Sequence, residues 1–156
     1  LEKKLPEMEQ TINILVINNK LNHPALELLK LFFLEYRKEL VSHFELEDDL
    51  LFPYACFLDK SRKGRHYLPM ILKNMQKFSI KQFVQAHENS NQELSKVREA
   101  ILSYKPSPTD ASPYRILLEQ LKHFEQDLNF HAMIEDEVLV PKLSKIEMEL
   151  KSSKLN

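Results

Sequence analysis

Apolar residues recur along this chain at steps of three and four, the spacing that places them on one face of an α-helix. A first helix is predicted over residues 1–18 from five apolar positions: Leu5, Met8, Ile12, Leu15 and Val16. The pattern breaks at NNKLNHP and resumes after Pro24, which suits the first position of a helix. His23 is therefore expected on the capping side of a second helix that runs to Pro53.

The rest of the chain predicts two further long helices. The polar stretch 59–69 contains the only glycine and is expected to be a connection, with a short helical turn at 68–77. A third helix is predicted over 79–104. The proline-rich loop KPSPTDASP then precedes a fourth helix, which begins at Ser112 and Pro113 and ends near residue 150.

Composition supports an all-α fold, because the chain has one Gly, no Trp and many strong helix formers. Four long helices with short connections favour an up-down-up-down four-helix bundle over residues 1–150, followed by a polar C-terminal tail at 151–156. The net charge is -1 and both signs are interspersed, which argues against a nucleic-acid partner. No signal peptide or membrane span is evident, so a cytoplasmic protein without a membrane partner is expected. The single cysteine, Cys56, fits a reducing compartment and is expected to be buried in the apolar sequence FPYACFL.

One motif occurs twice. HFELEDDLLFP at residues 43–53 and HAMIEDEVLVP at residues 131–141 share His, then Glu at the fourth following position, Asp at the fifth, Leu at the eighth and Pro at the tenth. Residues four apart on a helix lie on one face, roughly 6 Å apart. The repeat therefore pairs one imidazole with one carboxylate in each copy.

Two such pairs facing each other across a bundle core have the donors of a dinuclear metal site. His43 and His131 would supply terminal nitrogens, and Glu47 and Glu135 would supply bridging carboxylates. Mixed histidine and carboxylate ligands suit iron best, with manganese and zinc as weaker candidates. Two ordinary surface pairs are the alternative, which the matching offsets disfavour. Asp48 and its counterpart in the second copy are expected to lie near the ligands or to face solvent.

A fifth ligand is predicted on the third helix. If that helix and the fourth are antiparallel around the KPSPTDASP loop, His87 and His131 fall within a helical turn of the same level. The same counting excludes His23 and His123 as ligands, and His66 lies in the expected connection, where it should face solvent.

These segments resemble the hemerythrin-like (HHE) di-iron family, and within it the repair-of-iron-centres proteins, which are linked to nitrosative and oxidative stress. The similar pieces are VSHFELEDDLLFP, QAHENSNQEL, LNFHAMIEDEVLVP and LEKKLPEM, which span nearly the whole chain. The resemblance implies two non-haem iron ions, held by terminal and bridging ligands at the five positions His43, Glu47, His87, His131 and Glu135. It also implies a further histidine just upstream of Leu1. Asn91 stands where oxygen carriers of the family have a second histidine, which disfavours a dedicated oxygen carrier.

The resemblance implies a protein that reacts with nitric oxide, dioxygen or peroxide in the repair of damaged iron-sulfur centres, with a redox or iron-sulfur protein as partner. Whether it is an enzyme is left open. An oxygen- or redox-sensing or iron-storing module of a larger protein is one alternative. A metal-free helical interaction domain is another.

Overall fold

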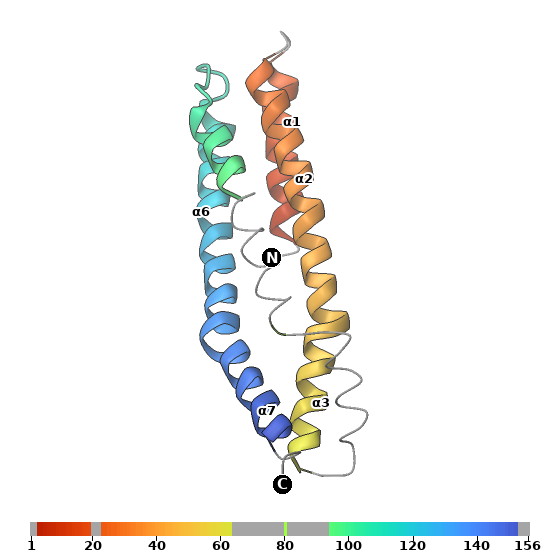
Figure 1. Ribbon diagram of the computed structural model, residues 1–156. Helices are drawn as coiled ribbons and strands as arrows, with labels where there is room; N and C mark the ends of the chain where they lie inside the picture. The colour runs from red at the N-terminus through yellow and green to blue at the C-terminus, as the bar shows by residue number, and fades with distance from the viewer. Residues whose placement is uncertain (1–2, 20–22, 64–79, 81–93, 153–156) are drawn as a thin grey trace. The chain divides into compact units, whose positions relative to one another are not determined.

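The computed structural model describes residues 3–19, 23–63, 80 and 94–152, and every regular element among these residues is helical (Figure 1). The predicted all-α class is therefore confirmed for the described part of the chain. In chain order the elements are α1 (Lys4–Asn18), α2 (Pro24–Leu46), the π-helical turn η1 (Glu47–Leu51), α3 (Phe52–Lys63), a helical segment at 94–103, α6 (Ala111–Ile134), the π-helical turn η3 (Glu135–Leu139) and α7 (Val140–Ser152).

The chain divides into two compact units. Unit 1 consists of Leu1–Leu40 with Asn89–His131, and unit 2 consists of Val41–Glu88 with Ala132–Asn156. Helices α2 and α6 each begin in unit 1 and end in unit 2. A single bundle over residues 1–150 stays a prediction.

The predicted apolar positions Leu5, Met8, Ile12 and Leu15 of the first helix are buried in the core of unit 1. Tyr36 of α2 packs edge-on against Phe124 of α6, with ring centroids 6.1 Å apart. Each fully buried side chain of this size contributes about 1.5–3 kcal/mol, so the buried side chains supply much of the stability of the unit. The buried apolar residues of its labelled helices are Leu5, Met8, Ile12 and Leu15 of α1, Leu26, Leu29, Phe33, Tyr36 and Leu40 of α2, and Leu117, Leu121, Phe124 and Leu128 of α6.

A buried carboxylate organises the start of α6. Asp110 directly precedes the helix and accepts hydrogen bonds from Asn19 Nδ2 at 2.8 Å, Tyr104 Oη at 3.0 Å and Ser107 Oγ at 2.7 Å. Burial raises the pKa of the Asp110 carboxyl, but these hydrogen bonds outweigh burial and hold that pKa below its usual range. Helix α6 therefore begins at Ala111, earlier than predicted, with Asp110 in the capping position.

The start of α2 matches its prediction. Pro24 is the first helical residue, and the His23 carbonyl accepts hydrogen bonds from the N–H groups of Leu26 and Glu27. His23 therefore lies on the capping side, as expected.

The helical path after the first motif is longer than predicted. The connection expected from residue 59 is wrong over 59–63, because α3 continues to Lys63. Leu58 and Ser61 are buried, whereas Asp59 and Lys60 are exposed, so the polar composition of this stretch reflects the outer face of a helix.

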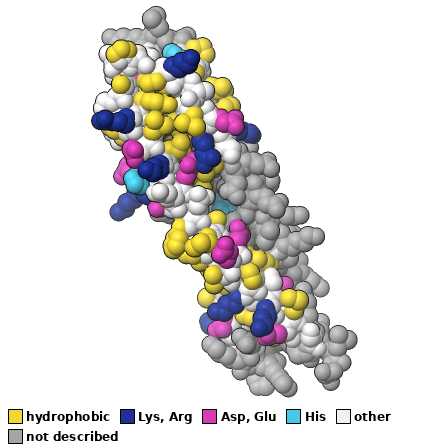
Figure 2. Space-filling view, turned by 90° about the vertical axis from the view of Figure 1, so that its left-hand side faces the viewer, with side chains coloured by type: hydrophobic (Ala, Val, Ile, Leu, Met, Phe, Trp, Pro, Cys, Tyr) yellow, Lys and Arg dark blue, Asp and Glu magenta, His cyan; other side chains and the backbone are white. Residues whose placement is uncertain are grey.

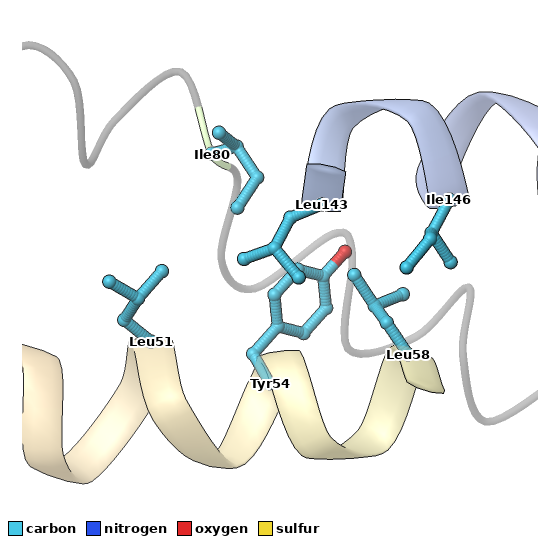
Figure 3. Packing of buried hydrophobic residues seen from close by; sticks show 6 residues of the cluster. All are labelled: Leu51, Tyr54, Leu58, Ile80, Leu143 and Ile146. Carbon is cyan, nitrogen blue, oxygen red and sulfur yellow. The ribbon is translucent and has the colours of Figure 1, made fainter. Parts of the chain in front are cut away.

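Unit 2 has a core of its own, shown in Figure 3. Side chains from η1 and α3 meet side chains from α7 in a cluster in which each member is at most 6% exposed. The members are Leu51, Tyr54, Leu58, Ile80, Leu143 and Ile146. This packing joins α3 to α7, the helices that follow the two motif copies.

The expected burial of Cys56 is wrong, because this residue is exposed. It stands two positions after Tyr54 and two before Leu58, which both point into the core. A residue midway between two inward positions of a helix lies on the outer face. The apolar composition of FPYACFL did not show which of its residues face outward.

The surface carries charges of both signs mixed with apolar side chains, as Figure 2 shows for one face. In unit 1, Lys4 Nζ lies 2.5 Å from Asp127 Oδ2 and Arg98 Nε lies 2.6 Å from Glu125 Oε1. Exposed pairs of this kind contribute little to stability, about 0–1 kcal/mol each.

Candidate metal centre

The first motif forms a close imidazole–carboxylate pair. His43 belongs to the last turn of α2 and Glu47 opens η1, four residues later. His43 Nε2 lies 2.7 Å from Glu47 Oε1, and the two side chains are only 9% and 3% exposed. The predicted sharing of one helix face is therefore realised in this copy.

The second motif adds a carboxylate to this pair. Glu135 opens η3 and is 2% exposed. One ligand atom each of His43, Glu47 and Glu135 lie within 4.8 Å of one another. All three residues belong to unit 2.

A group of two buried carboxylates and one imidazole has chemistry that suits a cation. Two ionised carboxylates at this separation repel each other, and each loses hydration on burial. A bound cation offsets both costs, and oxygen and nitrogen donors are ligands for iron, manganese and zinc. Proton sharing is the other way to relieve the repulsion.

Each of the two carboxylates stands at the start of a widened helical turn. The Phe52 N–H donates to the Glu47 carbonyl, and the Val140 N–H donates to the Glu135 carbonyl, so each hydrogen bond spans five residues. Single π-helical turns inside α-helices occur frequently at functional sites. The two copies of the motif thus have the same backbone form.

The remaining predicted ligands are placed less completely. His131 is half-buried in the last turn of α6, four residues before Glu135, and it is outside the close three-residue group. His87 lies outside the described residues. The ligand roles of all five residues stay predictions, although three of them lie together.

The excluded histidines have other surroundings. His23 caps α2 and lies edge-on to the Tyr104 ring, with centroids 5.3 Å apart. His123 is exposed and borders a cavity of about 590 Å³ between α1 and α6 of unit 1. His66 lies outside the described residues. Asp48 and Asp136 are exposed, so they face solvent.

The motif did not reveal a further buried polar contact in unit 2. The Tyr54 hydroxyl of α3 donates a hydrogen bond to the Glu147 carboxylate of α7. Burial raises the pKa of the Tyr54 phenol, and so do the hydrogen bond to Glu147 and the negative charge of that residue. Tyr54 is therefore a neutral phenol at physiological pH. The sequence signal for this contact is a tyrosine at an inward-facing helical position, because a buried tyrosine hydroxyl usually has a hydrogen-bond partner.

The comparisons with known proteins give one distant similarity to describe. The chain is 26% identical over 123 residues to the iron-sulfur cluster repair protein ScdA of Staphylococcus haemolyticus. No protein-family model matches the chain, and no solved structure matches it. Among the described residues, no helix has both the length and the apolar character needed to cross a membrane.

The matched stretch covers 79% of this chain and 51% of that protein, so the chain spans about half the length of the curated relative. This similarity supports the resemblance to repair proteins, whereas the hemerythrin-like domain stays a prediction. The chain is thus distantly similar, over most of its own length, to an iron-sulfur cluster repair protein.

Proposed function

We propose that this chain is a hemerythrin-like up-down-up-down four-helix bundle that holds two non-haem iron ions and takes part in the repair of damaged iron-sulfur centres. His43, Glu47, His87, His131 and Glu135 are the proposed ligands. Glu47 and Glu135 are the proposed bridging carboxylates, and manganese or zinc would be weaker occupants. Nitric oxide, dioxygen or peroxide is the proposed small-molecule reactant, and a redox or iron-sulfur protein is the proposed partner.

One observation carries the metal-binding part of this proposal. Two carboxylates that are each 2% exposed place ligand atoms within 4.8 Å of one another and of an imidazole nitrogen. Burying two like charges at this separation is unfavourable unless a cation or a shared proton compensates. The donor set therefore fits a bound metal.

The residues of the site have distinct roles in this proposal. The 2.7 Å contact between His43 and Glu47 holds both donors in position before a metal arrives. The carboxylates supply negative charge that offsets the charge of a cation. Bound iron would supply redox exchange with a small molecule. Because Glu47 and Glu135 are each 2% exposed, water has little access to this chemistry.

The repair role rests on the distant relative. That protein is described as an iron-sulfur cluster repair protein, and the matched stretch covers 51% of it. The full activity of such a protein is therefore proposed here by similarity alone.

The experiment that tests this proposal measures metal content in the intact chain. Protein reconstituted with ferrous iron without oxygen is passed through a desalting column, and iron per chain is measured by mass spectrometry. We expect about two irons per chain, because two bridging carboxylates serve two cations. The Glu47→Gln, Glu135→Gln double variant should lose this iron. The matched control is Asp48→Asn, Asp136→Asn, which changes the adjacent exposed carboxylates and should keep it.

The result also separates the alternatives. If the Glu47→Gln, Glu135→Gln variant retains as much iron as the Asp48→Asn, Asp136→Asn control, the two glutamates are not ligands. No iron in the unmodified chain would favour the metal-free interaction domain. If iron binds, adding nitric oxide and recording the electron paramagnetic resonance (EPR) spectrum tests the proposed reaction with that molecule.

A further inference from the structure

Tyr54 lies in an apolar environment and has a proton acceptor. Its side chain is 6% exposed and packs in the unit 2 cluster among Leu51, Leu58 and Leu143 (Figure 3). Its hydroxyl donates a hydrogen bond to the carboxylate of Glu147, which is half-buried on α7. The phenol is therefore shielded from solvent, while its proton has a base beside it.

The other described tyrosines have different surroundings. Tyr36 is 1% exposed, and its hydroxyl has no hydrogen-bond partner among the described residues. Tyr104 donates to Asp110, but that carboxylate also accepts hydrogen bonds from other donors and is a weaker base for that reason. Tyr114 donates to the backbone carbonyl of Ile101, which cannot take up a proton.

The charge change on oxidation distinguishes Tyr54 from Tyr36. Oxidation of a phenol that cannot release its proton creates a positive charge, which is costly in an apolar core. At Tyr54 the proton can move to Glu147, so a neutral phenol and a carboxylate become a neutral radical and a neutral acid. Oxidation there leaves no positive charge in the apolar core.

We propose that Tyr54 is a redox-active tyrosine that gives up one electron while its phenolic O–H bond breaks and the proton passes to the Glu147 carboxylate. The oxidant is one-electron reduced in this step. This assignment of the oxidant rests on the proposed function, in which iron oxidised by dioxygen or peroxide is held by the group of His43, Glu47 and Glu135. Tyr54 follows Glu47 by seven residues on continuous helical backbone, roughly 10 Å along the axis.

Two arms test the proposal on the intact chain. In the first arm, metal-free protein is oxidised by photogenerated ruthenium(III) tris(bipyridine). In the second arm, iron-loaded protein of measured iron content receives hydrogen peroxide. Both samples are frozen at increasing times, and the tyrosyl radical signal is followed by EPR.

We expect a long-lived radical in both arms, with most of it lost in Tyr54→Phe and retained in the matched buried control Tyr36→Phe. Glu147→Gln keeps a hydrogen-bond acceptor but cannot take the proton, so it should also lose most of the signal. Glu147→Asp should restore part of it. If Tyr54→Phe does not fold, as judged by circular dichroism, the two Glu147 variants decide the question.

A wild-type level of radical in Tyr54→Phe or in folded Glu147→Gln would overturn the proposal. If the chain binds iron but no long-lived radical forms in either arm, the proposal is overturned while the metal site stays intact. A Tyr54 radical in the metal-free arm of a chain that binds no iron would instead reject the proposed function and support the redox activity of Tyr54.

Discussion

Glu47→Gln should change stability in opposite directions with and without metal. The ligand atoms of Glu47, Glu135 and His43 lie within 4.8 Å of one another. Two unit negative charges at that separation repel by about 3 kcal/mol at an effective dielectric constant of about 20. Glutamine removes one of these charges, keeps the shape of the side chain and retains an oxygen for the His43 imidazole. We therefore expect the metal-free variant to be more stable than the metal-free parent by about 1–3 kcal/mol.

With iron present the order should reverse. A metal that binds only the folded chain adds about 2.7 kcal/mol at a free concentration one hundred times its dissociation constant. The variant forfeits most of this gain because it lacks a carboxylate ligand. The sign of the stability difference between parent and variant should therefore depend on the metal.

Urea unfolding followed by circular dichroism measures both differences, once with a chelator and once with ferrous iron under anaerobic conditions. Asp48→Asn is the control, since it neutralises the adjacent exposed carboxylate and should stay within about 0.5 kcal/mol of the parent in both conditions. A Glu47→Gln variant that is destabilised equally in both conditions would refute the reasoning, because the carboxylate would then be acting as an ordinary structural group.

Three further expectations follow from the described contacts. Leu58→Ala removes a fully buried side chain from the unit 2 core and should cost about 2–5 kcal/mol in urea unfolding, whereas Leu102→Ala, at a position 60% exposed, should cost less than about 0.5 kcal/mol. Asp110→Asn should cost about 1–3 kcal/mol at pH 7. The pKa of folded Asp110 lies below its usual range, so its carboxylate stabilises the fold above about pH 4 and loses this effect as it protonates on further acidification. The stability difference between Asp110→Asn and the parent should therefore shrink from pH 7 toward pH 2. Pro53→Ala restores an N–H donor just after η1 and should favour a regular α-helical turn there. We expect a lower iron affinity in anaerobic titration, with an unchanged helix content by circular dichroism. An unchanged affinity would show that Pro53 is not needed for the site.

The sequence predicted well those features that depend on local periodicity. The start of α2 at Pro24, the helical class and the pairing of His43 with Glu47 follow from steps of three and four and from capping chemistry. The expected loop at 59–63 failed because polar composition does not distinguish a loop from the outer face of a helix. The contact of Tyr54 with Glu147 could not be predicted, because residues 93 positions apart meet only through tertiary packing.

Metal ligation alone does not explain why the two copies of the motif also share a leucine and a proline. In the first copy the next inward residue after Glu47 is Leu51, which is 0% exposed, whereas Leu50 is 44% exposed. The second copy behaves alike, since Val138 is 59% exposed and Leu139 is packed against the unit 2 core. In each copy the shared leucine therefore lies on the inward face four residues after the glutamate, within the π-helical turn.

The proline at the tenth position of the motif stands just after that turn. Proline lacks the N–H of a regular helical ladder, and its ring crowds the carbonyl four residues earlier, so it disfavours a regular α-helix through the turn. The shared proline therefore favours a local backbone form and the shared leucine packs in the core of unit 2, while the shared histidine and glutamate supply the donors. A motif that repeats both parts keeps two buried carboxylates at the starts of two widened turns, and a substitution that regularises one turn should disturb the site without removing a ligand.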